Sequence, residues 1–452
     1  MPLARDLTAW VESAFSERQT DYSRFEGFYT GDHKVELTDR LREFLKVADT
    51  AFNANFCEGV VDVMTDRLSV VGFQAEDEAF NQWLWEIWQQ NRMDQAQRQT
   101  HTEACKLGDA YVMVDWDGQR GRSVMRFNEA RLIRPHYDPF DQNRIDYAAK
   151  RWKVKDDHYL TLYYPDRIEK YMRRHDVDWM PRLVQGEEWP LPWLLDSEPI
   201  GVPVVHFRNK PGAGQWGRSE LADVIPLQVI LNKTLVDLVM VLDTQGFPQR
   251  YVVNGQVPSG GFRIFPGAVW RIVPEAGEDS GVQVGQFSSE SPEGLIRAMD
   301  HLVEQIAAVT RTPLHLMKLT SGNFPSGEAL QSAEQGLVSK IVDRQSGFGD
   351  SWEDVMGLAR RTTAAFSDDP GGDETVIQTL WRDPATRNEL GQTQTMAVKV
   401  GQLGIPEAQA WRELGYTPDE VAQMLEDKQR EKAAQADLGS AILRQFNVGA
   451  PV

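Results

Sequence analysis

The residues with the most recognisable chemistry form a glycine-rich segment, Gly212 to Gly217, which reads G-A-G-Q-W-G. It matches the G-x-G-x-x-G pattern of dinucleotide-binding turns, in which a helix N-terminus binds the pyrophosphate and an acidic residue binds the ribose. An apolar run, Val202 to Phe207, precedes it, and Asp237 lies 20 residues after the last glycine. A nucleotide-dependent oxidoreductase is therefore one hypothesis for this chain.

Three features of the same segment disfavour nucleotide binding. Four residues, Arg208 to Pro211, separate the apolar run from the first glycine, whereas a dinucleotide fold needs a tight turn there. Trp216 is bulky at a place where the backbone would approach a pyrophosphate. Asp237 lies within an expected helix and not at the end of a second parallel strand. A structural turn is the favoured interpretation, and the oxidoreductase stays as the alternative.

Other patterns for catalysis or metal binding are weak. His101 and Cys105 are four residues apart on an expected helix, but no second pair offers further ligands, so core packing is favoured. The His-Asp-Val-Asp sequence at 175–178 alternates between faces of an extended segment and is expected in a solvated loop. No H-E-x-x-H, G-x-S-x-G or Walker A pattern occurs. We expect no catalytic residues, no cofactor and no metal site.

Three tryptophans, Trp83, Trp85 and Trp88, could form a stacking platform for single-stranded nucleic acid. They share one short expected helix with several aliphatic residues, which favours the core and subunit contacts instead. The sequence therefore indicates packing roles for this cluster.

Composition restricts the partners of the chain. Among 452 residues, 67 are Asp or Glu and 48 are Lys or Arg, which gives a formal net charge of −19. Proteins that grip nucleic acid are usually basic, so a tight DNA binder is disfavoured, while a conduit that lets DNA pass is compatible with this charge. Two cysteines cannot build a disulfide framework and indicate a reducing compartment. The most apolar run, Leu235 to Leu242, is interrupted by Asp237, so no membrane span is expected.

Hydrophobic periodicity predicts an α+β protein. Apolar residues at helical spacing dominate up to Leu107, after which short β-branched and aromatic runs predict antiparallel strands between Asp109 and Phe207. The predicted strands are Tyr111 to Val114, Arg131 to Ile133, Tyr147 to Val154, Tyr159 to Tyr163 and Val202 to Phe207.

Beyond these strands the chain is predicted to be mostly helical. A helix from Ser219 ends near Gly246, and a Gly/Pro-rich segment follows with brief strands at Tyr251 to Val253 and Val269 to Val273. The next helix covers Pro292 to Thr310, and Pro313 stops it. The later predictions are a loop from Leu314 to Pro325, a helix of about 60 Å from Ser326 to about Ala365 with candidate kinks at Gly336 and Gly347 to Gly349, a strand from Thr375 to Trp381, and a last helix from Thr417 to about Ala436.

A series of short motifs gives the chain a family likeness. In order, they are Tyr29 to His33, Asn53, Val60 to Asp62, Arg67-Leu68, Gly72-Phe73, Gly108 to Val112, Thr161 to Asp166, Gly217 to Leu221, Asn232-Lys233, Arg311 to Pro313 and Ser326 to Leu330. This succession, over roughly residues 20 to 425, resembles the portal proteins of tailed bacteriophages.

The resemblance implies a non-enzymatic ring, commonly of twelve copies, at one vertex of the virion capsid. Double-stranded DNA would enter and leave through it, and a terminase would supply the ATP chemistry. Its implied partners are other copies of the chain, the terminase large subunit, major capsid and scaffolding proteins and a head-completion or adaptor protein, with assembly in the host cytoplasm and no membrane partner. Another head-assembly protein is a third interpretation.

The family anatomy also assigns roles to segments. It implies a wing at 1–217, stem helices at 218–244 and 292–310, a clip at 245–291, a channel loop at 311–325, a long helix and wing strand at 326–382, and a crown at 383–452. In the channel loop, the expected DNA-facing residues are Lys318, Thr320, Ser321, Gly322 and Asn323. Asp237, Asp300 and Glu304 are expected to face the stem lumen, because a ring of stem helices needs apolar flanks and a polar inner face.

Overall fold

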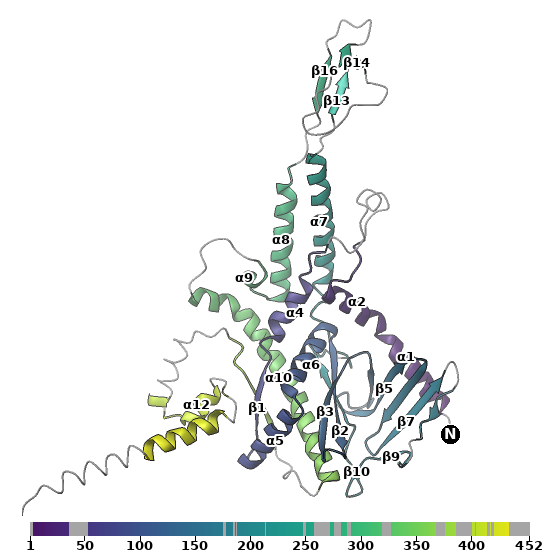
Figure 1. Ribbon diagram of the computed structural model, residues 1–452, viewed down its shortest axis with the longest axis vertical. Coiled ribbons are helices and arrows are strands. Elements are labelled where there is room, and N and C mark those ends of the chain that lie inside the picture. Colours follow the sequence, from purple (N-terminus) through teal and green to yellow (C-terminus); the bar gives the residue numbers. More distant parts are fainter. Residues whose placement is uncertain are drawn as a thin grey trace, which may run out of the picture.

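A pair of long helices rises from a mixed body of helices and sheets, and a small β module lies at the far end of the pair (Figure 1). This computed structural model describes residues 3–35, 53–174, 178–183, 186, 188–212, 214–246, 250–256, 272–274, 282–286, 291–318, 327–367, 376–385, 400–402, 404–413, 416 and 420–433. Helices and strands are both abundant, so the predicted α+β class is confirmed.

The N-terminal third is mainly helical, as the periodicity predicts. It contains α1 (Arg5–Glu17), α2 (Gln19–Thr30), α4 (Cys57–Thr65), β1 (Val70–Gln74), α5 (Glu78–Gln90) and α6 (Met93–Leu107). The Asp77 side chain caps α5 by accepting hydrogen bonds from the backbone amides of Ala79 and Phe80. Gly108 ends α6 with a φ of 99°, a left-handed conformation that glycine adopts at little cost.

Two antiparallel sheets follow. The first has the order β12-β2-β3, and the second has the order β4-β5-β6-β7-β8 with β9 also paired to β7. Their strands are β2 (Asp109–Asp117), β3 (Arg122–Asn128), β4 (Ile133–Tyr137), β5 (Ile145–Val154), β6 (Asp157–Tyr163), β7 (Arg167–Arg174), β8 (Met180–Pro181), β9 (Leu191–Pro192) and β12 (Val204–Arg208), and a short pair, β10 (Leu194–Leu195) and β11 (Glu198–Pro199), stands apart.

Two details of the strand prediction were wrong. Arg131 and Leu132 lie in a turn, and β4 begins only at Ile133. The strands β3 and β7 were not predicted, because each contains few buried apolar residues: Val124 and Met125 in β3, and Ile168 and Tyr171 in β7. In such half-exposed strands the apolar signal is too sparse to read without the neighbouring strand.

The long helix α10 (Gly327–Phe366) organises the core. Its 40 residues form one continuous helix that packs on β2, β3 and β12 and curves along its length in Figure 1. It passes through Gly336 and Gly349 without a break; at Gly349 a Cβ atom would lie 3.3 Å from Nε1 of Trp381, so glycine allows the close approach of β17 (Gln378–Trp381). Trp352 is fully buried, and its ring centroid lies 4.9 Å from that of Trp88.

The expected strand after the long helix is confirmed at Gln378–Trp381, where β17 pairs antiparallel with β1, a partner far away in the sequence. Beyond it, α12 (Glu407–Glu413) and a helix at 420–433 are described, and Arg412 forms an ion pair of 3.2 Å with Glu78. The predicted start of the last helix at Thr417 lies outside the described residues.

The helical pair consists of α7 (Ile225–Gly246) and α8 (Glu293–Thr310), which lie side by side (Figure 1). At their far end are the short strands β13 (Arg250–Val253), β14 (Gly255–Gln256), β15 (Val273–Pro274) and β16 (Gln283–Gln286). The helix predicted from Ser219 begins later, at Ile225, because the chain first forms turns around Glu220. Most of the predicted strand from Val269 to Val273 lies outside the described residues.

Candidate functional site

The paired helices α7 and α8 expose much apolar surface in the single chain. Within α7, residues Ile225–Leu242 have a mean hydropathy of 1.7 and are long and apolar enough to cross a membrane, yet only 28% of them are buried. The sequence analysis expected no membrane span, because Asp237 interrupts the short apolar run from Leu235 to Leu242. The longer stretch Ile225–Leu242 is apolar enough on average although it contains two charged residues. Val229, Ile230, Leu242, Ile296 and Val309 are each 47 to 50% exposed on this pair.

The three carboxylates expected to face a lumen all lie on this pair, but their surroundings differ. Asp237 on α7 and Glu304 on α8 are exposed, and Glu304 lies 3.8 Å from His301 one turn earlier. Asp300 is half-buried, and its Oδ1 lies 2.5 Å from Nζ of Lys318. The structure places these side chains on two neighbouring helices, and which of them would face a lumen stays a prediction.

The segment expected to be an irregular loop begins as a helix. Residues Leu314–Met317 form the short helix α9, so the prediction of a loop from Leu314 was wrong at its start. Lys318 ends this turn and pairs with Asp300, so its charge is already partly balanced. Thr320, Ser321, Gly322 and Asn323 lie outside the described residues. Within the described part, this segment contributes one cation, which is paired with Asp300 in the middle of α8.

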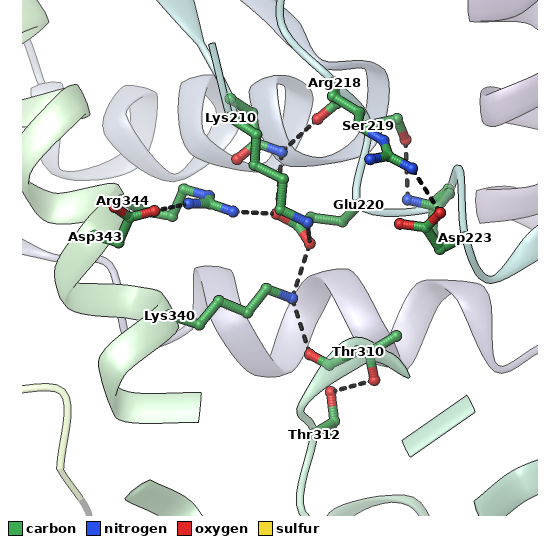
Figure 2. Close-up of polar contacts among 12 residues, drawn as sticks. Lys210, Arg218, Ser219, Glu220, Asp223, Thr310, Thr312, Lys340, Asp343 and Arg344 are labelled. Carbon is green, nitrogen blue, oxygen red and sulfur yellow. Dashed lines mark hydrogen bonds and ion pairs between the residues drawn. The ribbon is translucent and has the colours of Figure 1, made fainter. Parts of the chain in front are cut away.

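Where the end of α8 meets α10, a buried carboxylate contacts three cations (Figure 2). Glu220 is 3% exposed; its Oε2 lies 2.6 Å from Nζ of Lys210 and 2.8 Å from Nζ of Lys340, and its Oε1 accepts a bond of 3.0 Å from Arg344. Lys340 also donates to the carbonyl of Thr310, the last residue of α8. This junction connects the end of β12, α8 and α10 through one carboxylate.

The electrostatics of the junction favour an ionised Glu220. Burial alone would raise the pKa of its carboxyl, but Lys340, Lys210 and Arg344 outweigh burial and lower the pKa to about 2. The sequence analysis did not identify this cluster. The available signal was the Gly217 to Leu221 motif. Its Glu220 lies 120 residues before Lys340 and 124 residues before Arg344, and sequence spacing alone could not reveal that these side chains are in contact.

A second polar network fixes the lower half of α7. Asn232, 1% exposed, donates to Nε2 of His33 at 2.8 Å and to Oδ1 of Asn53 at 3.1 Å. Its own Oδ1 accepts bonds from the amide of Ala54 and the side chain of Gln228. All four hydrogen-bonding positions of this amide are thereby used. Through these bonds Asn232 connects three of the family motifs, which contain His33, Asn53 and Asn232 itself.

The glycine-rich segment leads into a structural turn and shows no dinucleotide geometry in its described residues. Its preceding strand, β12, is antiparallel to β2, whereas a dinucleotide fold needs parallel strands. The amide of Gly217 donates to Oδ1 of the buried Asp109 at 2.7 Å, and a Cβ atom on Gly217 would lie 2.0 Å from the carbonyl oxygen of Gly108. The segment is followed by turns, and α7 begins eight residues later.

Asp109 is charged despite its burial. Burial disfavours the carboxylate, but hydrogen bonds from His206 (2.9 Å), Tyr22 (2.7 Å) and Gly217 lower the pKa of Asp109 below its usual value. The group therefore joins α2, β2, β12 and the glycine turn as a structural centre.

The remaining candidates lie in the core. His101 donates to the carbonyl of Leu68 and accepts from Nε1 of Trp352 at 2.9 Å, and burial lowers its pKa to about 3. Burial also raises the pKa of Cys105. Trp85 and Trp88 are buried, so core packing is confirmed for these residues. His175 lies outside the described residues.

Comparison with known proteins identifies the family of this chain. The sequence matches the family "Phage portal protein, SPP1 Gp6-like" over residues 9–437. The chain belongs to this portal family. It is 27% identical over 450 residues to the portal protein of Mycobacterium phage D29, covering 93% of this chain and 87% of that one. It is 24% identical over 440 residues to the portal protein of Mycobacterium phage L5, covering 91% and 86%.

Family membership confirms the resemblance seen in the motifs. Phage portal proteins are structural, non-enzymatic components of the virion capsid at the head–tail connector, and this chain is one of them. The motifs that gave the likeness coincide with the junctions described above, at Glu220, at Asn232 and at the Gly108 and Gly217 contact. These are the places where distant parts of the portal chain are held together.

Proposed function

We propose that this chain assembles into a cyclic ring, of twelve copies, that forms the channel for double-stranded DNA at one capsid vertex. The observation that carries the proposal is the apolar surface of α7 and α8. A helix as apolar as Ile225–Leu242, with 28% of its residues buried in the single chain, needs further apolar partners, and neighbouring copies in a ring would supply them on both flanks.

In such a ring α7 and α8 form the stem, and the strands beyond them form the clip. Asp237, Asp300 and Glu304 line the lumen, and the loop with Lys318, Thr320, Ser321, Gly322 and Asn323 reaches toward the duplex. A formal net charge of −19 suits a conduit, because a basic bore would bind the phosphates and slow the moving DNA. The ring guides and retains the genome and is assembled in the host cytoplasm. It docks the terminase large subunit, the major capsid and scaffolding proteins and an adaptor protein, and it has no membrane partner.

Mass photometry and negative-stain electron microscopy of the purified protein test this proposal. We expect closed rings of about twelve times the 51.3 kDa chain mass. The variant Ile230→Glu places a charge on α7 at a side chain that is 50% exposed, so it should leave the chain folded and shift the mass toward monomers.

The matched control is Val154→Glu, which introduces the same charge at a 51% exposed position on β5. It should leave the rings intact. Monomers of the unaltered chain at every protein and salt concentration, or rings that tolerate Ile230→Glu as well as the control, would contradict the stem assignment.

A further inference from the structure

A cavity of about 800 Å³ opens where the foot of α8, the middle of α10 and the end of β12 meet, beside the Glu220 junction of Figure 2. It is lined by five cationic side chains, which come from all three elements: Arg208, Lys210, Arg311, Lys340 and Arg344. The one carboxylate among the described lining residues is Asp343, whose side chain is 75% exposed.

The cations exceed the anions that the single chain provides. Glu220, which contacts three of these cations, and Asp343 together balance two of the five positive charges. No carboxylate of the described residues lies within ion-pair distance of Arg208 or Arg311. This is a strong local excess in a chain whose net charge is −19.

The two deepest cations, Lys340 and Arg344, share one buried carboxylate, that of Glu220. The side chains of Lys340 and Arg344 are 6% and 5% exposed, and Nε of Arg344 has no hydrogen-bond partner. The single negative charge of Glu220 is divided among Lys210, Lys340 and Arg344, and burial lowers the pKa of Lys340. Because one buried carboxylate serves three cations, while the neighbouring Arg208 and Arg311 lack a carboxylate partner among the described residues, the cavity is suited to receive another anion.

Apolar contacts tie the same cavity to the stem surface. Val309, 50% exposed on α8, lines the cavity, and Thr310 and Arg311 follow it directly. The exposed apolar strip that we assign to subunit contacts therefore continues into the basic cavity. Charged groups beside an apolar strip are the usual composition of a protein–protein interface with a polar rim.

We propose that this cavity is the docking site for a carboxylate-bearing segment of a second copy of this chain. The inference rests on the proposed ring, and it adds which part of each subunit receives its neighbour and by what chemistry. A ring closes through unlike faces, so a basic cavity on one flank of each subunit is matched by acidic side chains on the opposite flank of the next. A narrow side chain reaches Lys340 and Arg344 at their depth, whereas duplex phosphates lie on a convex rod and favour exposed cations.

Zero-length carbodiimide cross-linking tests the contact, because it joins an amine and a carboxylate only when they touch. Rings are assembled from an equal mixture of ¹⁴N- and ¹⁵N-labelled chains, with Arg311→Lys introduced to supply an amine at the cavity rim. Peptide mass spectrometry then separates links within one chain from links between chains. We expect mixed-isotope links from the introduced amine or from Lys210 to an Asp or Glu of the second copy. The contact of 2.6 Å between Lys210 and Glu220 provides a same-chain link as internal control.

A charge reversal gives an independent readout. Arg311→Glu should raise the protein concentration needed for half-assembly by about tenfold, since each interface loses one attraction and gains one repulsion. Arg24→Glu, the same change at an exposed position of α2, is the matched control and should leave assembly unchanged.

The outcomes separate this inference from the proposed ring. Intact rings that give only same-chain links and tolerate Arg311→Glu would overturn the docking site and leave the ring standing. Absence of rings in the unaltered protein would overturn both. If added duplex DNA protects the introduced amine from acetylation and ring assembly does not, the cavity binds nucleic acid and the proposal is wrong.

Discussion

Replacing Glu220 by Gln should destabilise the chain strongly, because the change removes the single buried anion that Lys210, Lys340 and Arg344 share. The pKa of Glu220 is lowered from 4.5 to about 2, which corresponds to about 3 kcal/mol of stabilisation of the folded state by the charged form. Glu220 is 3% exposed, so solvent screens this contribution little. Removal of one partner from a buried ion pair costs a similar amount, about 3–5 kcal/mol.

The pH dependence follows from the direction of the shift. A depressed folded-state pKa contributes stability that is fully present above the unfolded pKa of 4.5 and is lost as the pH falls toward 2. Glu220→Gln should therefore lower the free energy of unfolding by about 3 kcal/mol at pH 7, and the gap to the unaltered chain should close on acidification through this window. Urea denaturation followed by fluorescence of the buried Trp88 and Trp352 measures both effects.

Two further variants make the test specific. Asp343→Asn removes the other carboxylate bonded to Arg344, but its side chain is 75% exposed, so the cost should stay below about 1 kcal/mol. Adding Lys340→Met to Glu220→Gln removes one uncompensated cation and should recover part of the lost stability. A Glu220→Gln chain within about 1 kcal/mol of the unaltered chain at pH 7, or a gap that persists unchanged at low pH, would refute the reasoning.

Four more predictions concern other elements. Deleting Thr320 to Asn323 should leave ring assembly and thermal stability nearly unchanged and reduce DNA packaging or retention in assembled particles; normal packaging by intact rings would remove this loop from the mechanism. Calorimetric titration with NAD, NADP or ATP should give no saturable heat, and Gly217→Ala should cost about 1–3 kcal/mol of stability, because its Cβ would lie 2.0 Å from the oxygen of Gly108. Asn232→Ala should cost about 1–3 kcal/mol in urea denaturation, because it leaves buried partners without their bonds, and a neutral result would show that water replaces the amide.

Local sequence patterns were sufficient to predict elements whose own residue spacing determines their structure. The helical spacing predicted α8 within one residue of its start, and the long helix predicted from Ser326 was found at Gly327–Phe366. The candidate kink at Gly349 is better explained by β17, whose Trp381 approaches that glycine. Strands that bury few side chains, such as β7, required knowledge of their neighbours.

The junctions could not be predicted from the sequence in the same way. Glu220 meets Lys340 and Arg344 across more than a hundred residues, and Asn232 meets His33 across about two hundred. No periodicity links such positions, because the contact is created by the packing of α10 and α7 against the body. The motif residues were recognisable, but only the three-dimensional arrangement shows that they are bonded to one another.

Helix α7 carries polar and charged residues among its apolar ones. Gln228 and Asn232 are buried at 0 to 1% exposure and bond to residues 53–56 and His33, so this half of the helix is held inside the protein. Further along, Lys233 and Asp237 are exposed on the same helix as exposed aliphatic side chains. A lipid-facing helix would carry a high cost for such charges, whereas a helix between protein neighbours and an aqueous lumen accommodates both kinds of surface. The mixed surface of α7 thus favours a subunit contact over a bilayer as the partner of its apolar residues.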